Sequence, residues 1–277
     1  MKKYRDRFKK YIPFAKAGAK TLLAYKATIF MWLIISLVDV GFIIFLYQAI
    51  YASSPDSVIN GFNFQEIIVY MTTSFLFSFL VLGNETSWNI FEDIKEGTIA
   101  NTLTKPVSYR LRHLFTAIGS ALTSICLIMI PFFIILYGIF IGLGFITVTW
   151  TFIFDVIIFI VLTFLAIIIT DAMGYFIGLL TFFTEHMFGL NMFKSAVQSF
   201  FSGQLLPLSY MGAFGVFCSY TPFAFLNSTP VLTLMGAIST TQAAIYVAVA
   251  LGWVILLEGI NKLIFKHCVR RLSVQGG

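Results

Sequence analysis

The sequence predicts an all-α integral membrane protein with six transmembrane helices. Of its 277 residues, 59% are hydrophobic and only 11% are charged, whereas an ordinary soluble domain carries about 25% charged residues. The apolar residues form continuous runs, which excludes the alternating strands of a barrel and indicates helices that bond their own backbone groups in lipid. About 20 such residues cross a hydrocarbon layer roughly 30 Å thick. The predicted spans of a single domain, residues 1–277, are 28–51, 64–83, 114–141, 150–181, 188–208 and 241–264.

The spans differ in regularity. The third and fourth are long enough to require tilt or a kink. The fifth is interrupted by Gly203 and stopped by Pro207. Residues 1–27 do not suit a cleavable signal peptide, because no persuasive small-residue cleavage site follows the first apolar run. We therefore expect the first span to stay in the mature protein.

The basic residues predict the orientation. The 18 Lys and Arg residues fall at or before Lys26, between spans two and three, at Lys194, and after residue 261. None lies in the opposite connections, residues 52–63, 142–149 and 209–240. This asymmetry predicts that both termini face the cytoplasm at the plasma membrane. The formal net charge of +6 then reflects contact with anionic lipid, and no nucleic-acid partner is expected.

Residues 1–27 predict an amphipathic helix on the inner leaflet. Lysines surround a set of apolar side chains, which suits a helix at the membrane surface. Pro13 and Gly18 disfavour a helix, so a solvated basic tail that only fixes the topology is the alternative. The apolar side chains at helical spacing are Phe8, Ile12, Ala15, Ala19 and Leu22.

The connection between spans two and three, residues 84–113, predicts an amphipathic cytoplasmic elbow. Trp88, Phe91 and Ile94 recur every three residues beside several carboxylates, which is typical of a helix with one apolar stripe. Gly97 is suited to end this helix, and Pro106 prevents a continuous helix into the third span. Such an elbow suits docking onto a cytoplasmic partner.

An apolar but broken stretch separates the fifth and sixth predicted spans. It carries no charge between Gln204 and Gln242, and Pro207, Pro222 and Pro230 interrupt it. Irregular backbone at membrane depth must be covered by protein or line a cavity. We expect short re-entrant helices at the outer face, with a kinked helix and a surface loop as the equal alternative.

Three acidic residues were identified in the apolar runs: Asp39 near the middle of the first, and Asp155 and Asp171 in the fourth. A carboxylate at the bilayer centre costs about 3 kcal/mol, so each should face other helices or a wet cavity. Lys194 is the one basic residue expected within a span as a partner. Asp39 and Asp171 are therefore pathway candidates for a proton or cation, or packing residues.

Chemistry for energy conversion is not expected in this chain. No G-x-x-x-x-G-K-[ST] phosphate loop is present, and Phe193 precedes Lys194 and Ser195 where that motif requires glycine. The three histidines have no i, i+4 pairing and the three cysteines are scattered, so no metal site, no catalytic residue and no disulfide framework is expected.

Two stretches carry a family pattern. Residues 201–236 contain a G-x-x-x-P-L break, a P-F turn and a P-x-x-x-x-x-G ending, and residues 94–107 fit I-x-x-G-x-I-x-x-x-L-x-K-P. Together with the order of features over nearly the whole chain, they resemble the permease subunits of ATP-binding-cassette exporters, in the bacterial drug-and-polysaccharide-exporter subclass with six helices.

That resemblance implies a multisubunit complex. Two phosphate-loop ATPase subunits, carrying ATP and Mg, would drive two permeases that are identical or homologous. The chain itself would hold no cofactor and would form the substrate pathway. The implied ATPase-coupling residues are Trp88, Phe91, Glu92, Asp93, Ile94, Lys95, Glu96, Gly97, Leu103, Lys105 and Pro106. The implied outer-gate residues are Gly203, Leu206, Pro207, Pro222 and Phe223.

Two other classes fit parts of the sequence. A secondary transporter would use Asp39 and Asp171 for a coupling proton or cation, but no inverted set of three spans is recognisable. A membrane assembly factor would have partners but no substrate. The 32 Phe residues suit a pathway for a drug, lipid or peptide and suit lipid contact equally, so the substrate stays open. Charge reversal at Glu92 and Asp93 is expected to uncouple ATP hydrolysis from export.

Overall fold

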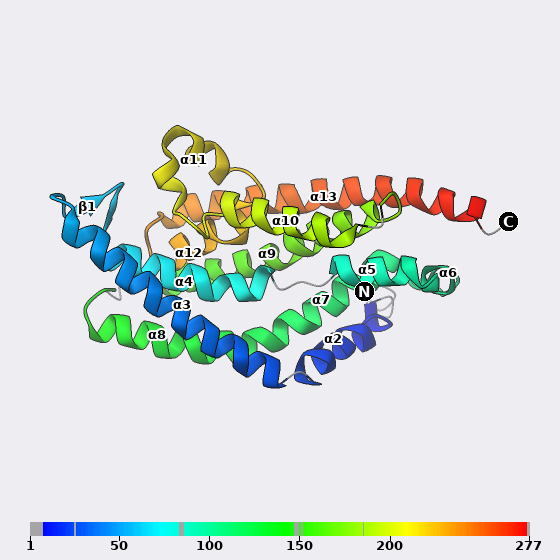
Figure 1. The fold of residues 1–277 in the computed structure, drawn as a ribbon, viewed down its shortest axis with the longest axis horizontal. Helices are drawn as coiled ribbons and strands as arrows, with labels where there is room; N and C mark the ends of the chain where they lie inside the picture. Colours follow the sequence, from blue (N-terminus) through cyan, green and yellow to red (C-terminus); the bar gives the residue numbers. More distant parts are fainter. Residues whose placement is uncertain are drawn as a thin grey trace.

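Long helices make up the body of the molecule, shown as a computed structural model in Figure 1. Parts of the predicted segments, at residues 1–7, 25, 83–85 and 151, lie outside the described residues. The structure describes residues 8–24, 26–82, 86–146, 150, 152–184 and 186–275, with the backbone alone at 26–30, 32–33, 36–37, 80, 82 and 271–275.

The elements follow one another with short connections. The first half of the chain contains α2 (Ile12–Ala24), α3 (Lys26–Ser53), β1 (Val58–Ile59), β2 (Phe62–Asn63), α4 (Phe64–Leu82), α5 (Thr86–Lys95), α6 (Thr98–Leu103), α7 (Tyr109–Ser124), η1 (Ile125–Met129) and α8 (Ile130–Gly142). The second half contains α9 (Phe152–Leu180), α10 (Met187–Phe201), η2 (Leu208–Met211), α11 (Gly212–Ser219), η3 (Ala224–Leu226), α12 (Ser228–Leu234) and α13 (Thr240–Gln275).

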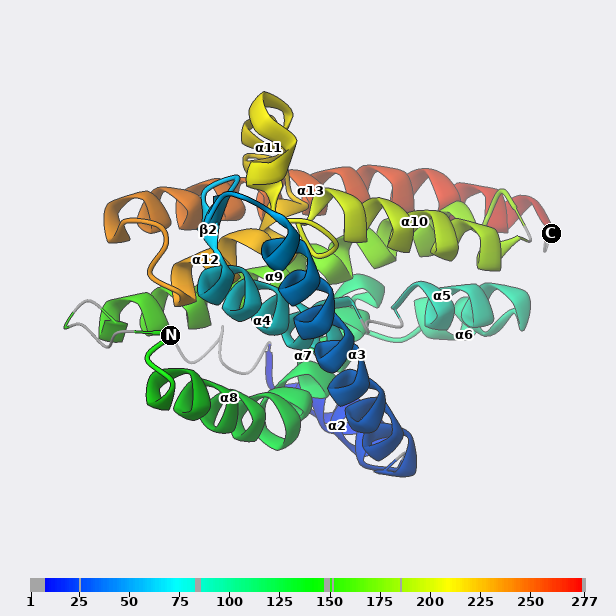
Figure 2. The ribbon, with the colours of Figure 1, turned by 60° about the vertical axis from the view of Figure 1, so that its left-hand side comes forward.

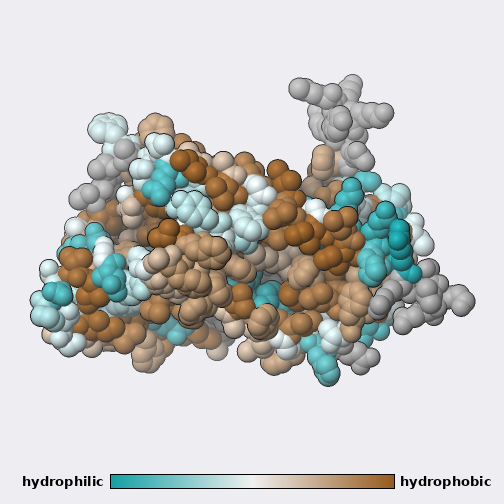
Figure 3. Space-filling view, turned by 90° about the horizontal axis from the view of Figure 1, so that it is seen from above, coloured by the Kyte–Doolittle hydropathy of each residue, from teal (hydrophilic) through white to brown (hydrophobic). Residues whose placement is uncertain are grey.

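Among the residues that the structure describes, three helical stretches are long and apolar enough to cross a membrane. They are Tyr109–Gly142, Phe152–Leu180 and Thr240–Arg270, with mean hydropathies of 2.7, 3.1 and 2.1. Figure 3 shows a broad hydrophobic band across the middle of the molecule, with hydrophilic residues gathered towards its two ends. The protein is therefore helical and membrane-embedded, while the arrangement of six spans stays a prediction.

Several helix ends differ from the predicted spans. Helix α7, which corresponds to the third predicted span, begins at Tyr109 and not at residue 114. Helix α13 continues past the predicted end at residue 264 to Gln275. Helix α10 ends at Phe201, short of residue 208, because Gly203 follows with a φ of +81°, and a left-handed glycine is a common helix end. A small hairpin also interrupts the all-α prediction: Val58 pairs with Asn63 around Asn60 and Gly61, which both have positive φ.

The third span, for which the sequence predicts tilt or a kink, contains a kink with a defined cause. Residues Ile125–Met129 form a π-helical turn directly before Pro131. Proline lacks an N–H and its ring displaces the carbonyl four residues earlier, here that of Leu127, and a π turn absorbs the displacement. Helices α7 and α8 consequently run in different directions (Figure 1).

Helix α9 is the centre of the packing. It contacts α4, α5, α7, α10, α12 and α13, and Figure 2 shows it near the middle of the bundle with α8 and α2 at one edge. Its buried side chains include Leu162, Ala166, Ile169 and Tyr175. Because α9 touches both the connection between α4 and α7 and the short helices of the opposite end, it connects the two regions for which the sequence predicts a function.

Helix α2 lies on α7 and not on the open surface of the bundle. The two backbones cross where Gly18 faces Thr116 and Gly119 faces Ala15. Tyr11 and Gly18 are buried, whereas Phe8 and Ile12 of the predicted apolar stripe are exposed. The segment is thus a helix, as predicted, in which Gly18 permits the close approach and Pro13 occupies the first turn, where no N–H is needed.

We expect Gly119→Ala to detach α2 from α7. The added Cβ would lie 1.9 Å from the carbonyl oxygen of Ala15, a backbone atom that must move, and overpacking of this kind costs about 1–3 kcal/mol. Amide hydrogen exchange of residues 12–24 should rise several-fold. Gly138→Ala is the matched control, because no atom lies within 4 Å of its Cβ; equal exchange in both variants would contradict the packing described.

Candidate functional site

The elbow between α4 and α7 is built from two short helices joined at Gly97. Helix α5 ends at Lys95, and Gly97 has a φ of +71°, a left-handed conformation that glycine adopts readily. Helix α7 begins at Tyr109, with Ser108 as its N-cap and Pro106 just before it. Gly97 and Pro106 therefore break the chain where the sequence predicted.

Helix α5 has an inward and an outward face, and the predicted stripe divides between them. Ile90 is fully buried and packs on Gly178 of α9, where a Cβ would lie 2.8 Å from the Ile90 Cβ. Trp88 is 38% exposed, and its ring contacts that of Phe91 at 6.0 Å between centroids. Ile94 packs inward and Lys95 lies over the Phe91 ring. Trp88, Phe91 and Ile94 therefore do not form one stripe. A helical turn takes 3.6 residues, so positions three apart move progressively around the helix.

The inward face belongs to a small core at the ends of α9 and α13. Its buried members come from α5, α6, α7, α9 and α13, so the elbow is part of the folded bundle and not a loose loop. Leu103 and Ile94 pack against it. The buried residues are Ile90, Ile99, Tyr109, Tyr175, Leu179 and Cys268.

The outward face leaves charged and aromatic groups available. Glu92, Lys95 and Glu96 are exposed, beside the Trp88 and Phe91 pair. Lys105 and Pro106 are exposed as well, at the end of the elbow next to α2. There the Lys10 Nζ donates to the Pro106 carbonyl at 2.7 Å, and the Ser108 amide donates to the Tyr11 hydroxyl at 2.8 Å. Residues 10 and 11, directly before α2, thereby support the elbow from the side.

Asp93 holds the elbow together from within. Its carboxylate accepts hydrogen bonds from Thr98 Oγ1 at 3.0 Å and the Tyr109 hydroxyl at 2.9 Å, with Arg112 and His113 at 3.7 and 3.6 Å. Burial opposes ionisation, but His113, Tyr109, Arg112 and Thr98 together lower the pKa of Asp93 below its ordinary value. Asp93 therefore stabilises the elbow from inside. Of the neighbouring carboxylates Glu92 and Asp93, only Glu92 is exposed to a partner.

Asp93→Asn should destabilise the elbow in a pH-dependent way. Since the folded-state pKa is lowered, the stabilisation is present above the unfolded carboxyl value of about 3.9 and is lost as the pH falls through the folded value. The gap in Tm between wild type and variant should be constant from about pH 6 to 8 and should narrow as the pH falls below about 4. A gap that widens on acidification would refute this role.

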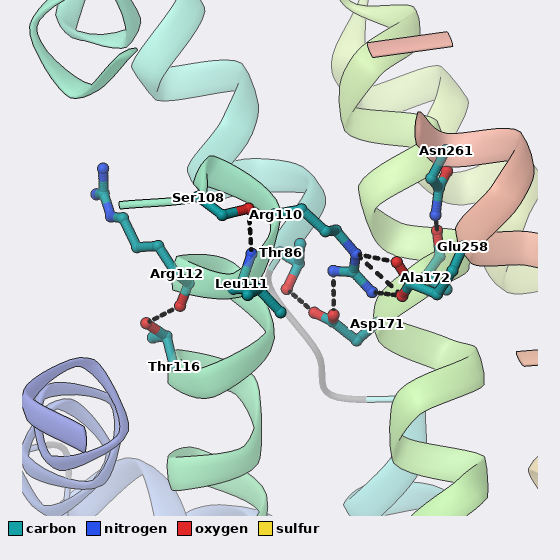
Figure 4. A network of polar contacts seen from close by, with 10 residues as sticks. All are labelled: Thr86, Ser108, Arg110, Leu111, Arg112, Thr116, Asp171, Ala172, Glu258 and Asn261. Carbon is teal, nitrogen blue, oxygen red and sulfur yellow. Dashed lines mark hydrogen bonds and ion pairs between the residues drawn. The ribbon is translucent and has the colours of Figure 1, made fainter. Parts of the chain in front are cut away.

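Arg110 joins three helices through two carboxylates (Figure 4). Its Nη1 donates to Asp171 of α9, its Nε lies 3.1 Å from both oxygens of Glu258 on α13, and its Nη2 donates to Glu258 Oε1 at 2.5 Å. Thr86, at the start of α5, donates to the other Asp171 oxygen at 2.5 Å. The Arg110 guanidinium also stacks on the Tyr175 ring, 4.8 Å from its centroid. Helices α5, α7, α9 and α13 are thus tied at one point.

This cluster corrects the expectation that Lys194 is the one basic partner available to the buried acids. Arg110 had been assigned to the cytoplasmic loop because its helix was expected to begin four residues later. Glu258 was overlooked, although it is a charge within the apolar run 241–264. Asp171 is completely buried, and a buried carboxylate requires a cation or several hydrogen-bond donors. That requirement is the signal in the sequence that points to Arg110, and Glu258 is the second carboxylate that Arg110 binds.

Asp39 is not part of this cluster. It is half-buried on α3, which packs mainly against α4. No hydrogen bond or ion pair joins Asp39 to Asp171 among the described side chains. The two predicted pathway acids therefore lie in different surroundings.

The predicted outer-gate residues surround the end of α10. Gly203 is buried, and its carbonyl accepts from the Tyr70 hydroxyl at 2.8 Å. Pro207 and Pro222 are buried, Leu206 is 44% exposed, and the Phe223 ring packs on Phe201 at 5.7 Å.

The segment that follows consists of short helices. One of them, α12, is buried against α9. Asn227, just before α12, donates to the Ser74 carbonyl and the Ser78 hydroxyl of α4 at 2.9 and 2.7 Å. The backbone around α12 is therefore covered by protein, whereas α11 (Gly212–Ser219) exposes Phe214, Val216 and Phe217.

Comparison with known proteins gives one match. A family described as ABC-2 family transporter protein matches residues 37–276. No curated protein and no solved structure matches the chain. The match covers the elbow, the ion cluster and the short outer helices.

Proposed function

Because the chain belongs to the ABC-2 family of transporter proteins, we propose that it is the permease subunit of an ATP-driven exporter, powered by a separate ATPase polypeptide. The observation that carries this proposal is the outward face of α5. The exposed Trp88 and the half-buried Phe91 form an aromatic pair among Glu92, Lys95 and Glu96, on a helix whose other face is fixed to the bundle. Exposed aromatic groups within a charged rim are typical of protein interfaces.

The contacts behind α5 support a role in coupling. Ile90 lies in close contact with Gly178 of α9, and Thr86 bonds Asp171 of the same helix. Packed interiors are not continuously deformable, so a displacement of α5 by a partner should move α9 with it. Arg110 extends this connection to α7 and α13. We infer that closure of two ATPase subunits around ATP and Mg is transmitted along this route.

The charge distribution supports an orientation with this end in the cytoplasm. Helices α2, α5 and α6 and the end of α13 lie at one end of the molecule (Figure 1). The basic residues between spans two and three lie in α5, in the α6–α7 connection and at the start of α7, and those after residue 261 lie in α13. By the positive-inside rule the opposite end, with the hairpin, faces outward across the plasma membrane.

A second permease would complete the pathway. Helix α3 leans away from the bundle and exposes Phe42 and Phe45 at 70% and 72%. Lipid or a homologous or identical chain could cover this surface. The short helices after Gly203 would then form the outer gate, and export would proceed between the two permeases.

The proposal is tested by purifying the tagged chain in mild detergent from its own membrane. We expect stoichiometric phosphate-loop ATPase subunits and ATP hydrolysis in the preparation. In the Glu92→Lys variant we expect coupled transport to be lost, while the ATPase still binds with equal or lower affinity. A chain that purifies without an ATPase, and whose flux is driven by a proton or cation gradient and abolished by Asp39→Asn, would instead be a secondary transporter.

A further inference from the structure

The polar and apolar sides of helix α10 are reversed relative to those of a surface helix in a soluble protein. Its outward side carries exposed apolar side chains, among them Phe188, Met192 and Phe193 at 69%, 57% and 69%. Its inward side, facing α5 and α9, is polar: Asn191, Lys194 and Gln198 are 9%, 9% and 2% exposed. These three positions share one helix face because they are three and four residues apart.

Two members of this polar stripe have fixed partners. Ser87 Oγ of α5 donates to Asn191 Oδ1 at 2.9 Å, and Gln198 Nε2 points at the Met173 sulfur at 3.4 Å. These contacts hold α10 against α5 and α9 and set the direction of the stripe. In this orientation the Asn191 Nδ2 is buried and has no hydrogen-bond acceptor among the residues that the structure describes.

Lys194 makes no hydrogen bond or ion pair with any residue that the structure describes. Asp171 is bonded to Arg110 and Thr86, and Glu258 to Arg110. A buried ammonium group needs an anion or several acceptors. Among the residues that the structure describes, the position thus combines a buried lysine amino group that has no anion beside it with a second N–H donor, one helical turn away, that has no acceptor.

We propose that Lys194 and Asn191 bind the anionic oxygen group, a carboxylate, sulfonate or phosphate, of an amphiphile whose apolar part lies along α10. Lysine is a strong donor to such groups, and the Asn191 Nδ2 would add a neutral hydrogen bond. The large exposed side chains of α10, among them Phe188, Met192 and Phe193, are apolar, which suits an acyl or aromatic body; Ser195 is the exposed polar residue beside them. That this amphiphile is exported cargo rests on the proposed function; the binding site itself does not.

The test measures binding of two probes that differ only in charge. The full chain is placed in phosphatidylcholine nanodiscs and titrated with 11-(dansylamino)undecanoic acid and with its primary amide. Wild type should bind the acid at least about tenfold more tightly than the amide. Lys194→Met should abolish this preference while staying folded, because it removes a buried unpaired charge; Lys194→Gln is the second variant, with the same expected loss.

Lys262→Met is the matched control. Lys262 is an exposed lysine of α13, so its removal makes the same change in net charge and should leave the preference intact. Equal binding of acid and amide by wild type, a preserved preference in both Lys194 variants, or an equal loss in the Lys262 variant would overturn the proposal. Equal binding is also the result expected if a carboxylate of a second copy occupies Lys194.

Two further arms identify the source of the anion. If a lipid headgroup is the natural occupant, phosphatidylglycerol in the nanodisc should displace the acid from wild type. If exported cargo is the occupant, ATP should drive Lys194-dependent uptake of the acid into inside-out vesicles that contain the complex. A Lys194-dependent acid preference without ATP-driven uptake would keep the anion site and count against the exporter, which separates the two failures.

Discussion

Arg110→Met should destabilise the protein by about 3–5 kcal/mol, the usual cost of removing one partner from a buried ion pair. The Arg110 side chain is 13% exposed and bonds Asp171, which is completely buried, and Glu258, which is 33% exposed. Without the guanidinium, two neighbouring carboxylates lose their cation. The loss should appear as a large drop in Tm in detergent or nanodiscs, together with a low yield of folded protein.

Two comparisons separate the ion cluster from a general effect of charge. Arg112→Met removes the next arginine, which is 29% exposed and 3.7 Å from Asp93, and should cost no more than about 1 kcal/mol. Replacing Arg110, Asp171 and Glu258 together by Met, Asn and Gln removes every charge of the cluster and should recover most of the lost stability. Equal effects of Arg110→Met and Arg112→Met would contradict the central position assigned to Arg110.

The double variant Trp88→Ala, Phe91→Ala should weaken binding of the ATPase subunit about 30-fold or more, because truncation of an aromatic anchor typically costs at least about 2 kcal/mol. Both rings lie on the outward face of α5, whereas the inward Ile90 and Asp93 hold the elbow. The variant should therefore keep the wild-type Tm. Binding of the copurifying ATPase, titrated onto the isolated permease, measures the effect.

Trp150→Ala is the control for removing an exposed tryptophan. Trp150 is 90% exposed in the connection between α8 and α9. Helix α8, which precedes this connection, lies towards the opposite end of the molecule from α5 (Figure 1). Trp150→Ala should leave ATPase binding unchanged. If the double variant also binds the ATPase with wild-type affinity, the outward face of α5 is not the docking surface.

Local features of the sequence were sufficient to locate the longest helices, although not all of their ends. Continuous apolar runs match α3, α4, α9 and α13 because a helix in lipid must be apolar over its full thickness. Gly97, Gly203 and Pro106 mark breaks through their own backbone preferences. Such features depend on neighbouring residues alone, which is why they can be identified without a structure.

The pairing of distant residues could not be identified in that way. Arg110 and Glu258 are separated by 148 positions, and their contact depends on how α7 and α13 pack around α9. Likewise, the division of α5 into an aromatic outward face and an inward face with Ile90 depends on the position of Gly178. The polar inward side of α10 had been read only as Lys194 at the edge of a span. Tertiary packing decides all three features.

The central claim is that the outward face of α5 meets an ATPase, and photo-crosslinking in the native membrane tests it most directly. p-Benzoylphenylalanine replaces Trp88 in one strain and Trp150 in another, and the crosslinked proteins are identified by mass spectrometry after irradiation. We predict a crosslink from position 88 to a protein with a phosphate-loop ATPase motif, and no such product from position 150. A crosslink from position 88 to lipid alone, or to other proteins but never to an ATPase, would contradict the claim.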